Sequence, residues 1–267
     1  MKKVVSAPYL IWMAIFVIVP LLMVAYFAFF KDGHFTLDYV ANVSQYSNIF
    51  IRSIWLAAIA TAICLVIAYP VAMILSEMDT KYQGTILMIV MLPMWMNFLL
   101  RTYAWMTILG NNGILNQFFG FFGLGPFKML NTQGAVVLGM VYNYIPFMLL
   151  PIYNVIAKID KSVLEAAQDL GCNRAQVILK TILPLSMPGI MSGITMVFVP
   201  AISTFIISRM LGGGGNLLIG DLIEMQFLGN SYNPNLGAAI SLVLMVIVLL
   251  IMTLMNQFDA DDDRPLI

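Results

Sequence analysis

Charged side chains are scarce in this sequence, and their scarcity excludes most soluble folds. Only 10% of the 267 residues are Asp, Glu, Lys or Arg, whereas 61% are hydrophobic, and the formal net charge is zero. A soluble domain carries charges at about a quarter of its positions, far more than are present here. A neutral chain without a basic groove also gives no reason to expect nucleic acid as a partner.

Histidine and cysteine are nearly missing as well. His34 is the only histidine, and the two cysteines, Cys64 and Cys172, fall in an apolar run and in a polar loop. These residues supply neither the ligands of a metal site nor a disulfide framework. The chain has no Gly-Lys pair, and therefore no phosphate-binding loop of an ATPase. Because no catalytic constellation is present, we expect a chain that is not an enzyme and that holds no metal.

The hydrophobic residues form six long runs. About 20 apolar residues cross a bilayer as a helix, and backbone groups in lipid must bond within the segment, which excludes open strands. We therefore expect an all-α polytopic membrane protein with six transmembrane helices. The predicted spans are 8–30, 53–75, 86–109, 135–157, 187–209 and 237–257. The first run is too long for the apolar part of a signal peptide, so we expect it to remain as a span.

The distribution of Lys and Arg predicts that both termini are cytoplasmic. If the N-terminus is inside, the inside segments hold eight basic residues and the outside loops hold three, with Arg209 at the end of a span. Cytoplasmic loops carry the excess of positive charge. The inside set is Lys2, Lys3, Lys81, Lys158, Lys161, Arg174, Lys180 and Arg264, and the outside set is Lys31, Arg52 and Lys128.

Three segments follow from this topology. Residues 1–48 form the first transmembrane helix and an outside loop, residues 49–257 form the membrane core, and residues 258–267 form an acidic cytoplasmic tail. Five of the six predicted spans contain an internal proline, which removes a helical hydrogen bond and favours a kink. Ordinary membrane-helix prolines and helices bent around a central pathway are both compatible with this pattern. These prolines are Pro20, Pro70, Pro93, Pro146 with Pro151, and Pro200.

The longest inside loop, residues 158–186 between the fourth and fifth spans, has the signals of two short helices. Ser162 stands three residues before Glu165, which is typical of a capping box, and Gly171 suits the left-handed position that ends a helix. Asn173 opens the second helix with another capping box, three residues before Gln176. Pro184 is then expected to stop that helix before the fifth span.

This loop resembles the EAA loop of the permeases of binding-protein-dependent ATP-binding cassette importers. The residues on the positions of the motif are Glu165, Ala166, Ala167, Gly171, Leu183 and Pro184. One position departs, because the pattern favours isoleucine where this chain has Thr181. The resemblance implies that the loop forms a coupling helix that seats in a groove of an ATPase subunit. An ordinary amphipathic loop helix is the alternative.

Other segments resemble the spermidine/putrescine branch of that family. They are 101–105 (RTYAW), 146–151 (PFMLLP), 211–215, 219–220 and 226–227. The resemblance implies a permease subunit in a bacterial plasma membrane that translocates spermidine or putrescine. It further implies a separate ATPase that binds ATP and magnesium, a second permease that is a sister chain, and an external solute-binding protein. The alternatives are import of another small solute (amino acid, phosphonate, metal or thiamine-like) by the same machinery, and a passive channel.

A polyamine is a multivalent cation that aromatic faces, carbonyls and carboxylates can hold. No Asp or Glu lies well inside a predicted span, so the candidate path depends on aromatic side chains and on two acids of the last outside loop, three residues apart on one helix face. The candidates are Trp95, Tyr103, Trp105, Tyr142, Tyr144, Asp221 and Glu224. The aromatic residues are equally compatible with an interfacial belt or core packing, and the two acids with an ion pair to Arg209.

Arg101 is the one charged residue clearly within a predicted span. Intramembrane charges usually face a cavity or a partner. We therefore expect Arg101 to be paired, or to extend its charged end toward the interface.

Overall fold

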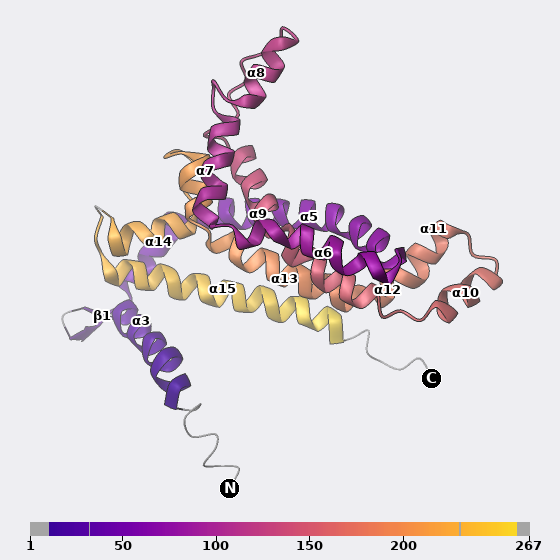
Figure 1. The fold of residues 1–267 in the computed structure, drawn as a ribbon. Coiled ribbons are helices and arrows are strands. Elements are labelled where there is room, and N and C mark those ends of the chain that lie inside the picture. Colours follow the sequence, from indigo (N-terminus) through magenta and orange to yellow (C-terminus); the bar gives the residue numbers. More distant parts are fainter. Residues whose placement is uncertain (1–10, 32, 230, 261–267) are drawn as a thin grey trace.

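The computed structural model describes residues 11–31, 33–229 and 231–260, and it is built almost entirely from helices (Figure 1). The strands within this described part form one small antiparallel hairpin, in which Phe30 faces Phe35. The described residues do not include Lys2, Lys3, Arg264 or most of the acidic tail. The elements are η1 (Ala14–Ile18), α3 (Val19–Phe29), β1 (Phe30–Lys31), β2 (His34–Phe35), α4 (Asp38–Asn42), η2 (Val43–Tyr46), α5 (Ser47–Glu77), α6 (Thr80–Trp95), α7 (Phe98–Leu109), α8 (Ile114–Phe121), α9 (Gln133–Ile156), α10 (Lys161–Asp169), α11 (Arg174–Val177), η3 (Ile178–Ile182), α12 (Leu183–Leu185), α13 (Met187–Ser203), η4 (Ser208–Gly212), α14 (Ile219–Leu228) and α15 (Pro234–Ala260).

Four helical segments of the described chain are long and apolar enough to cross a membrane without a break. They are Ile11–Phe29, Asp38–Glu77, Gln133–Ile156 and Pro234–Met255, and they correspond to the first, second, fourth and sixth predicted spans. Two further apolar segments are pairs of helices bent at a break, by 86° and by 65°. The described chain therefore has between four and six candidate spans, depending on whether each bent pair crosses the membrane as one unit.

The prediction of one continuous helix over residues 86–109 is wrong. The chain leaves the helix at Met96, whose backbone is extended, and starts α7 at Phe98 in a new direction. Pro93 provides one cause, because it lacks the N–H that would continue the hydrogen-bond ladder. Asn97 provides the other, because its side-chain oxygen accepts a hydrogen bond from the backbone N–H of Leu99 at 2.8 Å and caps the new helix.

The predicted span over residues 187–209 also ends early. Helix α13 stops at Ser203, where the next residue is extended, and Arg209 lies in the separate π-helical turn η4. Pro200 lies within the last turn of α13, where its missing N–H weakens the ladder. The outer end of this region is therefore a short irregular segment that leads to the glycine-rich run, instead of the end of a straight span.

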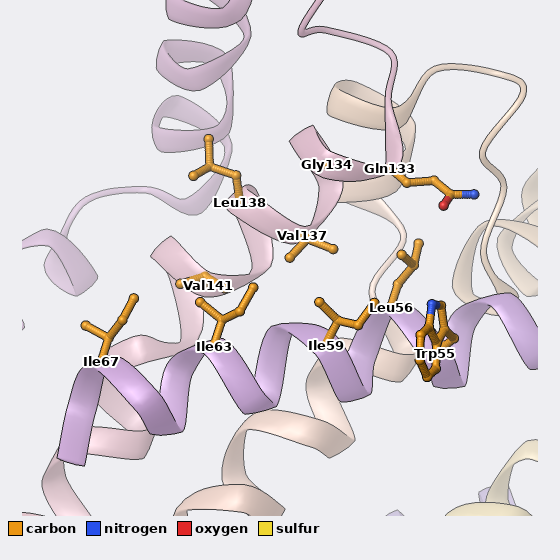
Figure 2. A pocket seen from close by; sticks show the side chains of 10 residues that line it. All are labelled: Trp55, Leu56, Ile59, Ile63, Ile67, Gln133, Gly134, Val137, Leu138 and Val141. Carbon is orange, nitrogen blue, oxygen red and sulfur yellow. The ribbon is translucent and has the colours of Figure 1, made fainter.

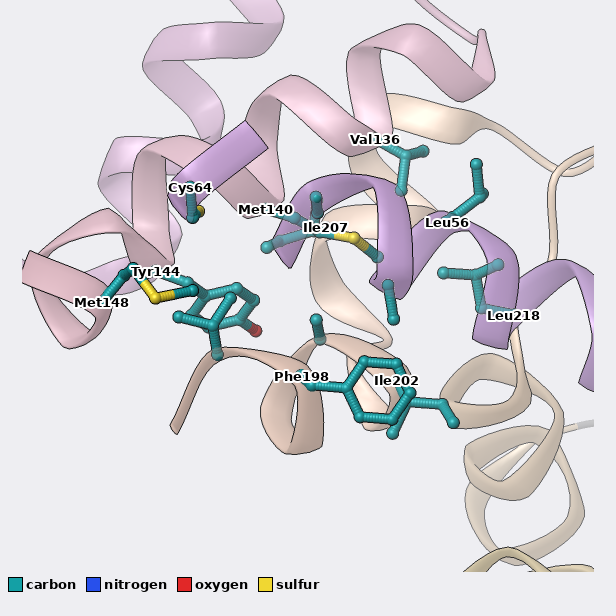
Figure 3. Close-up of a cluster of buried hydrophobic side chains, with 14 of the residues drawn as sticks. Leu56, Cys64, Val136, Met140, Tyr144, Met148, Phe198, Ile202, Ile207 and Leu218 are labelled. Atoms are coloured by element: carbon teal, nitrogen blue, oxygen red, sulfur yellow. The ribbon is translucent and has the colours of Figure 1, made fainter. Parts of the chain in front are cut away.

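The core of the molecule lies where α5, α9 and α13 pack together. Figure 3 shows Cys64 of α5, Met140 of α9 and Ile202 of α13 in this cluster, and all three are fully buried. Small residues allow the backbones to approach, as is usual between membrane helices. A Cβ atom added to Gly189 would lie only 2.8 Å from the carbonyl oxygen of Pro151, so α13 and α9 touch backbone to backbone there.

The first helix, α3, packs against α15 and its side chains are otherwise largely exposed. Asn235, at the start of α15, donates hydrogen bonds from its amide to the carbonyl oxygens of Phe27 and Phe30, both at 2.8 Å. These carbonyls stand at the C-terminal end of α3 and have no partner inside the helix. The contact therefore fixes the end of the first helix to the last one.

Candidate functional site

The helix pair α10 and α11 projects from one end of the bundle (Figure 1). Helix α10 is capped by Asp160, whose Oδ1 accepts a hydrogen bond from the N–H of Ser162 at 3.0 Å. The predicted capping box between Ser162 and Glu165 is therefore wrong, because Asp160 offers an acceptor two residues earlier and Ser162 already lies in the helix. The hydrogen bond to Ser162 lowers the pKa of the exposed Asp160 carboxyl.

Gly171 ends α10 as the sequence predicts. Its φ is +86°, in the left-handed region that favours glycine. The N–H of Gly171 donates to the carbonyl of Gln168 at 2.8 Å, and that of Cys172 donates to Ala167 at 3.2 Å. This is the Schellman arrangement, and Ala167 and Cys172 provide its hydrophobic contact, both partly buried against the core. The glycine thus turns the chain back toward the membrane.

The second predicted capping box is confirmed. The Asn173 side chain accepts a hydrogen bond from the N–H of Gln176, and the Gln176 side chain accepts one from the N–H of Asn173, both at 2.9 Å. Pro184, however, does not stop this helix. The helix continues through the π-helical turn η3 into α12 and ends at Leu185, one residue beyond Pro184, and the chain bends at Ser186.

One face of α10 presents an exposed apolar stripe. Val163, Ala166 and Leu170 are spaced three and then four residues apart, so they lie on one side of the helix, and all three are exposed. Leu170 is 86% exposed. Val163 and Leu170 were not among the residues predicted for this site, although an apolar residue directly before the terminal glycine was a visible signal. Glu165 is also exposed on α10.

The base of this loop is tied to neighbouring helices. Arg174 and Glu77 form an ion pair at 3.0 Å between α11 and the end of α5, and both side chains are mostly exposed. Such surface pairs contribute about 0–1 kcal/mol. The Gln83 side chain bridges two elements, donating to the Met78 carbonyl at 2.8 Å and accepting from the Tyr153 hydroxyl at 2.9 Å. It therefore holds the turn between α5 and α6 against α9.

The aromatic candidates fall into two groups. Trp105 and Tyr142 meet edge to face, with ring centroids 5.3 Å apart. Tyr144 is buried in the core cluster (Figure 3), and its hydroxyl lies 3.4 Å from the carbonyl oxygen of Pro200. Trp95 and Tyr103 are 77% and 52% exposed and are separated by the break between α6 and α7. The chain thus brings Trp105 and Tyr142 together and leaves Trp95 and Tyr103 on the surface.

The acidic candidates form a cluster with Arg209. Asp221 is completely buried, and its Oδ2 accepts a hydrogen bond from the N–H of Leu218 at 2.9 Å. Arg209 pairs with Glu224 through two contacts, one of them 3.0 Å from Nη1 to Oε1, and its Nε lies 4.0 Å from Oδ1 of Asp221. The sequence left open whether these acids line a substrate path or pair with Arg209, and in this structure they pair with Arg209.

The surroundings shift the pKa values of Asp221 and Glu224 in opposite directions. Burial raises the pKa of the Asp221 carboxyl above its ordinary value, although its hydrogen bonds and the Arg209 charge oppose the shift. The hydrogen bond from Arg209 lowers the pKa of the more accessible Glu224 carboxyl. The Arg209–Glu224 pair consequently persists to more acidic pH than an isolated glutamate would allow.

Arg101 forms no ion pair within the described residues. Its side chain is only 8% exposed, and its Nε has no hydrogen-bond partner there. The guanidinium instead lies over the ring of Phe98, 5.8 Å from the centroid. A cation–π contact of this kind contributes about 0.5–2 kcal/mol. It occurs because both residues lie in the first turn of α7, three positions apart.

A groove of about 520 Å³ lies between side chains of α5 and α9 (Figure 2). Isoleucine side chains line one wall along α5, and Gln133 is the main polar group at its end. A groove of this composition suits an acyl chain or another apolar helix. It offers no carboxylate to a polycation, so we do not assign it to the substrate path.

The family described as binding-protein-dependent transport system inner membrane component matches residues 1–261. The chain belongs to this family. The permease is therefore a multi-pass protein of a bacterial plasma membrane.

Relatives of this permease cover nearly its whole length. It is 39% identical over 261 residues to the spermidine/putrescine transport system permease protein PotB of Haemophilus influenzae, covering 94% of this chain and 91% of the relative. It is 38% identical over 248 residues to PotB of Escherichia coli, with 89% and 90% covered. The inner membrane ABC transporter permease protein YdcU of Escherichia coli is 27% identical over 277 residues, with 95% and 88% covered.

Solved structures confirm the fold of the permease. A chain of a bacterial ABC transporter involved in the import of the acidic polysaccharide alginate superimposes with a TM-score of 0.79 and 20% identity, covering 98% of this chain and 96% of that one. A chain of the MetNI methionine ABC transporter in an inward-facing conformation gives a TM-score of 0.59 at 16% identity, covering 82% and 96%. At this identity the likeness concerns the fold alone.

Proposed function

We propose that this permease imports spermidine and putrescine as the membrane-spanning subunit of an ATP-driven complex. The observation that supports the transport mechanism is the projection of α10, whose exposed apolar stripe can pack against a partner. The polyamine substrate is supported by the 39% identity to a spermidine/putrescine permease over most of both chains. Both termini are cytoplasmic in this proposal, α6 and α7 together form the third of six spans, and α13 forms the fifth.

The complex contains three kinds of partner. ATPase subunits bind ATP and magnesium and receive the α10 projection, a second permease of the same family completes the pathway, and a solute-binding protein delivers substrate from outside. This chain contributes no catalytic group to ATP hydrolysis. Its role is to convert movement of the ATPase into movement of α9 and α13, which the loop joins directly.

The substrate path in this proposal runs along aromatic and acidic side chains. Several weak cation–π contacts, each about 0.5–2 kcal/mol, let a polyamine enter and also leave. The residues assigned to the path are Trp95, Tyr103, Trp105, Tyr142, Tyr144, Asp221 and Glu224. Alanine variants of Trp95, Trp105, Asp221 and Glu224 in assembled complexes test this assignment, and unchanged spermidine uptake in all four would remove it.

Uptake by the reconstituted complex tests the function. We expect accumulation of radiolabelled spermidine in proteoliposomes only with ATP, and competition by putrescine but not by amino acids, phosphonates or thiamine. Uptake without ATP would indicate a passive channel. Competition by one of the other solutes, with no effect of polyamines, would leave the importer and overturn the substrate.

Co-purification tests the docking of α10. Leu170→Asp places a charge on the exposed stripe, and we expect it to reduce the ATPase recovered with the permease. Leu228→Asp is a matched control, because Leu228 is 82% exposed on α14, in the predicted last outside loop. Equal recovery in both variants would show that α10 does not dock on the ATPase.

A further inference from the structure

Asp221 is a buried acid with an unused acceptor. The residue is fully buried, and its Oδ1 atom has no hydrogen-bond partner in the part of the chain that the structure describes. The nearest cation, Nε of Arg209, is 4.0 Å away, which is beyond hydrogen-bond distance. Buried carboxylates are normally paired and hydrogen-bonded. Within the described residues, Oδ1 of Asp221 therefore accepts no N–H hydrogen bond, and the nearby Ser208 hydroxyl donates to the carbonyl of Phe205 at 3.0 Å.

The backbone around the two acids is held firmly. The N–H of Leu218 donates to Asp221, and the N–H of Ile219 donates to Ser53 of α5 at 2.9 Å. Gly220 lies against the carbonyl of Ser203, where an added Cβ would approach to 2.4 Å. Helix α14 therefore presents both carboxylates from a fixed position.

Arg209, in contrast, reaches the acids with a side chain that is 48% exposed. Its backbone belongs to η4, which is anchored by buried residues such as Leu211. If the contacts with Glu224 are released, the guanidinium can turn toward solvent while the rest of η4 stays in place. Arg52, the other cation nearby, donates to the carbonyl of Gly215 at 3.1 Å and forms no ion pair with either acid in the described part of the chain.

We propose that Asp221 and Glu224 form a binding site for an ammonium group of the cationic substrate, and that Arg209 occupies this site until the substrate displaces it. An alkylammonium offers three N–H donors, enough for Glu224 and for the free Oδ1 of Asp221. Exchange of one cation for another leaves the charge of the cluster unchanged, so no buried acid is left uncompensated. This inference rests on the proposed function, because it assumes a polyamine substrate.

Thiol labelling of the assembled complex tests the exchange. In a permease with Cys64→Ser and Cys172→Ser, Arg209→Cys places a thiol beside the two acids. We expect a cationic methanethiosulfonate to react faster than an anionic one, and spermidine to slow the cationic reagent. Addition of Glu224→Gln should remove most of this preference. Equal rates for the two reagents, or no protection by spermidine, would overturn the proposal.

Direct binding gives a second test that does not require the cysteine variant to assemble. Radiolabelled spermidine is bound to the complex without its solute-binding protein, with Arg52→Gln as the control that removes an outer charge away from the acids. Glu224→Gln should weaken binding roughly fivefold, the size of a partly exposed ion pair, and Arg52→Gln should not. Equal binding by both variants would overturn the site, whereas absence of spermidine uptake by the wild-type complex would overturn the proposed function instead.

Discussion

At the residue scale, Gly171 shows how a single position shapes the coupling loop. Its φ of +86° is available to glycine without strain, and a Cβ atom at this position would meet nothing within 4 Å. The requirement for glycine is therefore conformational and owes nothing to crowding. The Schellman turn that it permits directs Cys172 back against Ala167.

Replacement of Gly171 tests whether the backbone conformation, and not crowding, requires glycine at this position. Gly171→Ala should cost about 1–2 kcal/mol, because a Cβ is unfavourable in the left-handed region. Gly171→Asn should cost less, since asparagine tolerates this region better. The recovery of ATPase with each variant and the thermal midpoint of the complex provide the measurement. If alanine and asparagine have equal effects, the turn does not depend on the backbone conformation.

At the element scale, the break between α6 and α7 is determined by local chemistry. Pro93 weakens the end of one helix, and Asn97 caps the start of the next with hydrogen bonds to the N–H groups of Leu99 and Leu100. The break turns the helix pair by 86° and gives α7 a direction of its own. Trp105 consequently reaches Tyr142 of α9 although Trp95 does not approach them.

The Asn97 cap can be removed selectively. Asn97→Ala should lower the stability of the permease by about 1 kcal/mol, whereas Asn97→Ser should retain most of it, because serine is an equally good N-cap. Thermal midpoints in detergent measure the difference. Identical midpoints for the two variants would mean that the cap does not stabilise α7.

Close helix packing supplies a second test at this scale. Gly189→Ala should destabilise the permease by about 1–3 kcal/mol through overpacking, because its Cβ would lie 2.8 Å from the Pro151 oxygen of α9. Gly84→Ala is the matched control in α6, since its Cβ would meet nothing within 4 Å. In an open helical position alanine is favoured by roughly 0.5–1 kcal/mol. Opposite shifts of the thermal midpoint are therefore expected, and equal shifts would contradict the α9–α13 contact.

At the scale of the whole molecule, the loop and the acidic cluster belong to opposite ends of the predicted topology. The α10 projection follows α9, and the cluster of Arg209, Asp221 and Glu224 follows α13. Helices α9 and α13 connect the two ends and pack on α5 between them. Movement of the loop by a partner therefore has a direct path to the acidic cluster.

The two cysteines test this orientation. Cys64 is fully buried and Cys172 is partly accessible, so only Cys172 should react readily with a membrane-impermeant maleimide. We expect labelling in inside-out vesicles and none in intact cells, with Cys172→Ser as the control. Labelling of Cys172 from the exterior would contradict the cytoplasmic position of the loop and the topology as a whole.

The sequence by itself determined the class of the protein and the ends of its coupling loop. Long apolar runs have only one stable form in lipid, and Gly171 and the Asn173–Gln176 box act within a few residues, so local rules suffice. The sequence placed a helix before Gly171, where α10 is found, although Asp160 replaced Ser162 as its cap. Capping choices one or two residues apart differ too little in energy for a sequence to decide between them.

The tertiary structure decided what depends on distant contacts. The sequence left the pairing of the acids with Arg209 as one of two alternatives, and nothing in it indicated that Asp221 is buried or that Arg101 lies over Phe98. The break at Asn97 was also not predicted. A run of apolar residues indicates that a segment enters the membrane, but it does not show whether the helix axis bends within that segment. Burial and pairing arise only when α5, η4 and α14 meet, and these elements come from separate parts of the chain.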